Sequence, residues 1–165
     1  MLYHKLRLFQ RLGFSIAYPL LMRLIDDFNA GKLDIANFDG VLNMLLSYLV
    51  RRNICDLKVR EAFGVLLSAY EYIKTANVNL NQEPQPYHIS IESMGKYLGY
   101  LTGGERAPTD IELESRFSEV KASDLKILDF ILLQIEVSHN EIEPKDVDIE
   151  YVFPKKPTKN WRKIG

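Results

Sequence analysis

Residues 34–55 read DIANFDGVLNMLLSYLVRRNIC and predict a long amphipathic helix. Apolar side chains recur three or four positions apart, at Phe38, Val41, Leu42, Leu45 and Leu49. This spacing places them on one face of a helix that packs against a core. Asp34 precedes the first turn and is a good N-cap, because its carboxylate can accept a hydrogen bond from a free backbone N–H.

The segments on either side of residues 34–55 also have helical periodicity. Residues 18–30 predict a helix with Pro19 in its first turn and Gly31 as its C-terminal cap. Residues 57–75 predict a third helix with one apolar face. Residues 77–88 contain two prolines and several amides and predict a loop. The first half of the chain is therefore expected to be packed helices.

Capping signals continue in the second half. Ser90 is placed to cap a short helix, and Thr109 with Glu112 has the spacing of a capping box. Residues 123–138 are apolar almost all round, so this helix is expected to be the most buried one. The leucines and the phenylalanine expected to share one core are Leu45, Leu49, Phe63, Leu66, Leu128 and Leu132.

The periodicity changes near the C-terminus. Residues 146–153 read DVDIEYVF, in which polar and apolar side chains alternate, and this period of two predicts a β-strand that ends at Pro154. The predicted fold class is therefore all-α, a bundle of five to seven helices with a short C-terminal β-strand. The helical domain is expected to span residues 1–140. A lone strand has an unpaired edge, so a homodimer through this strand is a further expectation.

Composition narrows the class of protein. The chain has 165 residues, which is enough for one hydrophobic core. Its net charge of −1 excludes a basic field over the whole surface. The single cysteine cannot form an internal disulfide. No apolar stretch approaches the roughly 20 residues that a bilayer requires. We therefore expect a cytoplasmic protein that does not enter a membrane.

Four segments carry a resemblance to a known family. They are YPLLMRLIDDFNAGKLDIANFDGVLNMLLSYLVRRNIC (18–55), APTDIELESRF (107–117), LKILDFILLQIE (125–136) and VDIEYVFP (147–154). In this order they resemble the helical middle region and the start of the HNH part of GmrSD-type restriction endonucleases. That family joins a ParB-like, nucleotide-dependent domain to a metal-dependent HNH nuclease and restricts foreign DNA such as phage DNA. The resemblance implies that residues 141–165 are a truncated or degenerate start of the nuclease motif, from a fragment or a decayed gene.

The resemblance also implies which residues would serve the nuclease. The family's strand reads Ile-Glu-His-x-x-Pro, and its histidine acts as the general base; Tyr151 stands at that position here. A phenol with an ordinary pKa near 10 is a poor base at neutral pH. Glu150 matches the acidic neighbour that contacts the divalent metal of an intact nuclease. With one carboxylate and no histidine, we expect this chain to bind no cofactor and to be catalytically inactive.

Two groups of basic residues are candidates for nucleic-acid binding. Arg51 and Arg52 suit bidentate phosphate contacts, but they also occupy the last turn of a helix, where cations offset the helix dipole and pair with acids. The second group lies in the C-terminal tail, where a DNA-contacting strip and a solvated tail are alternative interpretations. Its members are Lys155, Lys156, Lys159 and Arg162.

Two functions follow from these observations. The first is a helical scaffold or linker module of a GmrSD-like restriction protein, whose partners would be DNA and an N-terminal ParB-like domain or partner chain. The alternative is an α-helical protein-interaction domain with no nucleic-acid role. The sequence leaves open which DNA modification would be recognised and whether a nucleotide is needed.

Overall fold

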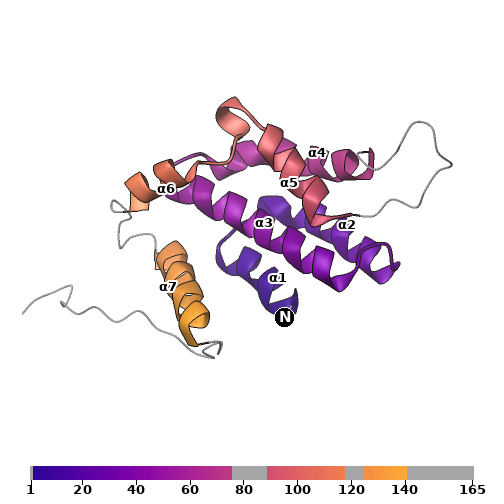
Figure 1. Cartoon of the computed structure of the whole chain (residues 1–165), viewed down its shortest axis with the longest axis horizontal. Helices are drawn as coiled ribbons and strands as arrows, with labels where there is room; N and C mark the ends of the chain where they lie inside the picture. Colours follow the sequence, from indigo (N-terminus) through magenta and orange to yellow (C-terminus); the bar gives the residue numbers. More distant parts are fainter. Residues whose placement is uncertain (1, 76–88, 118–124, 141–165) are drawn as a thin grey trace, which may run out of the picture. The chain divides into compact units, whose positions relative to one another are not determined.

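The computed structural model describes residues 2–75, 89–117 and 125–140, and within these ranges the chain forms seven α-helices and three short 3-10 turns (Figure 1). They are α1 (Leu2–Arg11), η1 (Ser15–Ala17), α2 (Tyr18–Asn29), α3 (Ile35–Ile54), η2 (Val59–Glu61), α4 (Ala62–Thr75), α5 (Ile91–Tyr100), η3 (Gly103–Glu105), α6 (Asp110–Phe117) and α7 (Leu125–Asn140). The all-α prediction is confirmed for these residues. The strand predicted at residues 146–153 lies outside them.

The chain divides into two compact units, Met1–Lys121 and Ala122–Gly165. Helices α1 to α6 belong to the first unit, and α7 belongs to the second. The sequence interpretation instead grouped α7 with the other helices, in a domain ending at residue 140.

Four helices of the first unit close into a ring. α3 packs against α2 and α5, and α4 packs against the same two helices from the other side. α1 and α6 are added to this ring through contacts with α3, which is the longest helix of the unit in Figure 1. The largest apolar side chains that are almost completely buried include Phe9, Leu24, Phe38, Leu42, Leu45, Leu49, Leu66 and Ile73.

The helix boundaries follow the capping residues. The Asp34 carboxylate accepts a hydrogen bond from the backbone N–H of Asn37 at 2.8 Å, as an N-cap should. Gly31 has a φ of 70°, the left-handed conformation expected after the end of α2. Ser90 caps α5 by accepting from the backbone N–H of Ser93 at 3.1 Å. These three predictions are confirmed. Each cap could be predicted because the residues that form it are close in the sequence.

The helix predicted at residues 57–75 begins later than expected. The turn η2 occupies its start, and α4 begins at Ala62. The face of α4 that meets the core is built partly from the small residues Ala62 and Ala69, whereas Phe63 is 44% exposed. The prediction that Phe63 lies in the shared core is therefore wrong, because Phe63 lies off the buried stripe of α4, which is formed by Ala62, Val65, Leu66, Ala69, Tyr70 and Ile73.

The expectation that residues 123–138 form the most buried helix is also wrong. In α7, Leu132 is 44% exposed and Ile135 is 47% exposed, while Ile127 is buried. Leu128 is only half-buried. A helix with apolar residues on nearly every face has no periodicity that marks its buried side, so its composition overstated its burial.

Candidate functional site

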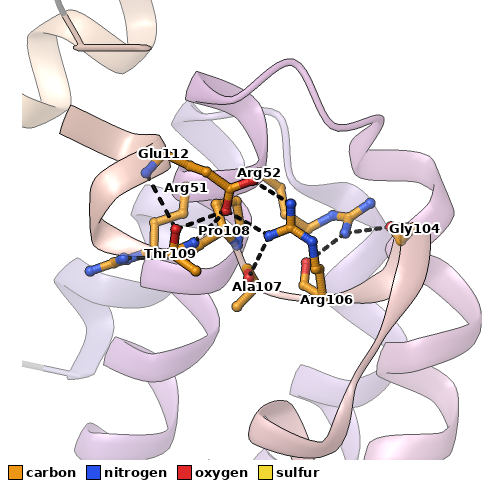
Figure 2. A network of polar contacts seen from close by, with 8 residues as sticks. All are labelled: Arg51, Arg52, Gly104, Arg106, Ala107, Pro108, Thr109 and Glu112. Atoms are coloured by element: carbon orange, nitrogen blue, oxygen red, sulfur yellow. Dashed lines mark hydrogen bonds and ion pairs between the residues drawn. The ribbon is translucent and has the colours of Figure 1, made fainter. Parts of the chain in front are cut away.

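A network of polar contacts joins the C-terminal end of α3 to the chain between α5 and α6 (Figure 2). Arg51 and Arg52 extend from the last turn of α3. Their partners between α5 and α6 lie more than 50 residues further along the chain. Two of the segments that carry the family resemblance, residues 18–55 and 107–117, therefore meet at this point.

Arg52 is completely buried, with an exposed fraction of 0%. Its Nη1 donates hydrogen bonds to the carbonyl oxygens of Gly104 at 2.8 Å and Arg106 at 3.0 Å. Its Nη2 donates to the carbonyl oxygen of Lys58 at 3.1 Å and lies 3.8 Å from the Glu61 carboxylate. These acceptors offset the cost of removing a cation from water. Arg52 therefore holds two loop segments on α3 and presents no surface to a phosphate.

The position of Arg52 in the sequence of α3 indicates this burial. Arg52 follows Leu45 and Leu49 at spacings of seven and three residues, so it continues the apolar stripe of α3. Arg51 lies off that stripe. A charged residue in line with a core-facing stripe indicates an internal partner. Which residues would supply that partner could not be read from the sequence.

Tyr48 lies one helical turn before Arg52 and supports the same loop. Its hydroxyl donates to the carbonyl oxygen of Glu105 at 2.6 Å, and the Arg52 guanidinium lies 5.5 Å from the centre of its ring. Burial raises the pKa of Tyr48 above its usual value of 10.0, although the positive charge of Arg52 acts in the opposite direction. The hydroxyl is therefore protonated at neutral pH and remains a donor.

Arg51 has a different environment from its neighbour. Its side chain is 30% exposed, and its Nη1 donates to the Asp110 carboxylate at 2.5 Å and to the Pro108 carbonyl at 3.4 Å. This pairing with an acid agrees with the interpretation that the two arginines are cations at the end of a helix. The geometry favours that interpretation over a phosphate contact.

Arg106 forms a bidentate ion pair with Glu112. The sequence did not predict this pair. Arg106 Nη1 donates to Glu112 Oε2 at 2.7 Å, and Nη2 donates to Oε1. Glu112 also accepts from the Thr109 backbone N–H at 2.8 Å, and its own N–H donates to the Thr109 hydroxyl at 3.3 Å. The predicted capping box of Thr109 and Glu112 is therefore confirmed.

These contacts predict an unusual titration of Glu112. Hydrogen bonds from Arg106 and then from Thr109 lower the pKa of Glu112 from 4.5 to about 2. Because the folded pKa is the lower one, the stabilisation is complete above pH 4.5 and is lost as the pH falls toward 2. We expect an NMR titration of the Glu112 side chain to give a midpoint near the lower value. In Arg106→Gln the midpoint should rise but stay below the ordinary pKa, since Thr109 still donates. A normal midpoint in the unmodified protein would contradict this geometry.

An open pocket of about 440 Å³ lies between the end of α3 and α6. Its lining residues are Cys55, Leu57, Ile111, Glu112, Ser115 and Arg116. Burial raises the pKa of the Cys55 thiol, so the thiolate that would act as a nucleophile is depleted at neutral pH. This pocket therefore lacks an activated cysteine.

The remaining predicted site residues fall outside the described ranges. They are Glu150, Tyr151, Lys155, Lys156, Lys159 and Arg162. Within the ranges that are described, no three acidic, histidine or cysteine side chains are grouped so that they could hold a metal ion. None of the helices in this part of the chain combines the length and the apolar character needed to cross a bilayer.

The resemblance to GmrSD-type restriction endonucleases stays a prediction. The contacts of Arg51 and Arg52 with residues 104–110 bring two of its segments together, but helix ends and loops meet in this way in many helical proteins. Comparison of the chain with protein-family models, with curated proteins and with solved structures returned no significant match.

Proposed function

We propose that this chain is a helical scaffold or linker module of a GmrSD-like DNA restriction protein, a phage-defence protein of the cytoplasm, and that it is not catalytic itself. The observation that carries the proposal is the engagement of Arg52 inside the first unit. Its guanidinium fixes the Gly104 and Arg106 carbonyls to the end of α3. This contact favours a structural role for the paired arginines in the segment that resembles the family.

The C-terminal residues give the proposal its connection to DNA. Residues 141–165 would be the degenerate start of the nuclease motif, with Tyr151 in place of the catalytic histidine and Glu150 as the only matching metal ligand. Within the same segment, four basic side chains that follow Tyr151 would contact phosphate: Lys155, Lys156, Lys159 and Arg162. An N-terminal ParB-like domain or partner chain would supply the nucleotide-dependent step, and the strand at residues 146–153 would pair two copies.

We expect the purified chain to bind duplex DNA at low salt but not to cleave it. Plasmid incubated with Mg²⁺ or Mn²⁺ should stay supercoiled, because the general base and most metal ligands are missing. DNA affinity should fall as salt rises, since phosphate contacts release counterions. The measurements are gel analysis of the plasmid and a fluorescence-anisotropy titration at several salt concentrations.

Two variants separate the candidate DNA-binding residues. Replacing Lys155, Lys156, Lys159 and Arg162 with glutamine together should abolish binding, whereas Arg51→Gln should leave it unchanged. Metal-dependent nicking that disappears in Glu150→Ala would contradict the proposal of an inactive chain. A complete lack of DNA binding would instead favour the alternative, an α-helical protein-interaction domain with no nucleic-acid role.

A further inference from the structure

Helix α6 buries none of its eight residues. Ile111 is 80% exposed and Phe117 is 45% exposed. A helix in which no side chain is fully buried and only one apolar residue, Leu113, is half-buried gains little from the hydrophobic effect, and a helix this short is not stable alone in water. Its position on the first unit therefore depends on polar contacts.

Two ion pairs tie α6 to the end of α3. One joins Arg51 Nη1 to Asp110 Oδ1 at 2.5 Å, and the other joins Arg116 Nη1 to Asp56 Oδ2 at 3.9 Å. Both acids are largely exposed, with side-chain exposures of 80% for Asp110 and 83% for Asp56. Exposed ion pairs contribute little to stability and are screened by salt.

The surface of α6 that faces α3 is not closely packed. The pocket of about 440 Å³ lies there, and the α6 residues that line it are Ile111, Glu112, Ser115 and Arg116. Close packing is the usual source of rigidity between helices. Its absence leaves α6 with little to resist separation.

The attachment changes abruptly at Arg106. Residues 104–106 are held by the buried contacts of Arg52 and Tyr48. The contacts of Glu112 with Arg106 and Thr109 are local to the segment and can move with the helix. The chain therefore has a fixed point before α6 and a preserved cap at its start.

We propose that α6 is a salt-sensitive lid, which opens from the end of α3 while the rest of the first unit stays folded. Opening breaks the Arg51–Asp110 and Arg116–Asp56 ion pairs and removes the α6 side of the open pocket, which leaves the half-buried Cys55 more exposed. This inference concerns the motion of α6 and does not depend on the proposed role in DNA restriction.

Hydrogen exchange followed by mass spectrometry tests the lid directly in the full chain. The protein is compared at about 0.05 M and about 1 M NaCl, where the screening length falls from more than 10 Å to about 3 Å. We expect exchange of the peptide containing residues 110–117 to accelerate by roughly three- to tenfold at high salt, since screening removes weak exposed pairs. Peptides from α3 and α4 should keep the same rates.

Variants identify the contact that closes the lid. Asp110→Asn and Arg51→Gln should each accelerate hydrogen exchange of α6 at low salt. The double variant should exchange no faster than either single variant, because both substitutions remove the same ion pair. Glu114→Gln is the matched control: it makes the same charge change on the same helix, at an exposed acid with no ion-pair partner among the described residues. It should leave the exchange rate unchanged.

The single cysteine supplies a second measurement. Alkylation of Cys55 by iodoacetamide, which is uncharged, should be faster at high salt and in the Asp110→Asn and Arg51→Gln variants. Each rate is corrected for the alkylation rate of the unfolded protein at the same salt concentration. The lid is excluded if α6 exchanges only together with α3, at a rate that neither salt nor Asp110→Asn changes. Equal acceleration in Glu114→Gln would also overturn it, because the effect would then come from total charge rather than from the ion pair.

Discussion

Replacing Arg52 with methionine is expected to lower the free energy of unfolding by about 3–5 kcal/mol, because it removes three hydrogen bonds that a buried charged group donates. Methionine keeps much of the length of the side chain but donates no hydrogen bond. The carbonyl oxygens of Lys58, Gly104 and Arg106 then lose the donor that they share in the buried state. Each of these part-buried acceptors that is left without a donor adds to the cost.

Arg51→Met is the matched control for this experiment. The two arginines are adjacent and lie in the same helical turn, but Arg51 is 30% exposed and pairs with an exposed acid. Its loss should cost about 1 kcal/mol or less. Urea unfolding followed by far-UV circular dichroism measures both variants. Equal losses, or a larger loss for Arg51→Met, would contradict the burial of Arg52.

A second adjacent pair tests the register of α4. Leu66 is 1% exposed, whereas Leu67 is 46% exposed. Leu66→Ala should lower the free energy of unfolding by about 2–5 kcal/mol, because it removes buried methyl groups and leaves a cavity. Leu67→Ala should change it by roughly 0.5 kcal/mol or less, since alanine also favours the helix.

The same urea titration distinguishes these two leucine variants. Both change leucine to alanine in one helix, so differences in helix propensity cancel between them. A larger loss for Leu67→Ala would mean that α4 is rotated by about one residue, which is 100° on a helix of 3.6 residues per turn. In that case Phe63 would also need to be reassigned.

Local signals explain most of what the sequence predicted correctly. The caps Asp34, Ser90 and Thr109 each accept a hydrogen bond from an N–H three residues away, so they can be recognised without knowledge of the fold. The periodicity of residues 34–55 likewise identified the buried Leu42, Leu45 and Leu49 of α3, although it did not include the buried Leu46. These features fix where several helices begin and which face of the longest one is apolar.

Contacts between distant residues explain what the sequence did not reveal. Whether Phe63 or Ala62 meets the core depends on the rotation of α4 about its axis, which its packing against other helices sets. The role of Arg52 depends on carbonyl groups, which every residue carries and which no side-chain pattern can mark. The pairing of Arg106 with Glu112 was missed for another reason, because six residues separate them and the intervening chain is only partly helical.

The buried guanidinium also bears on when the protein can fold during synthesis. Two of the Arg52 acceptors, at Gly104 and Arg106, are translated 52 and 54 residues after it. Until they leave the ribosome, the nascent chain must either keep the end of α3 in water or bury a cation with too few partners. The first unit therefore completes its core only after Arg106 has left the ribosome, and the earlier helices are exposed to proteases and chaperones until then.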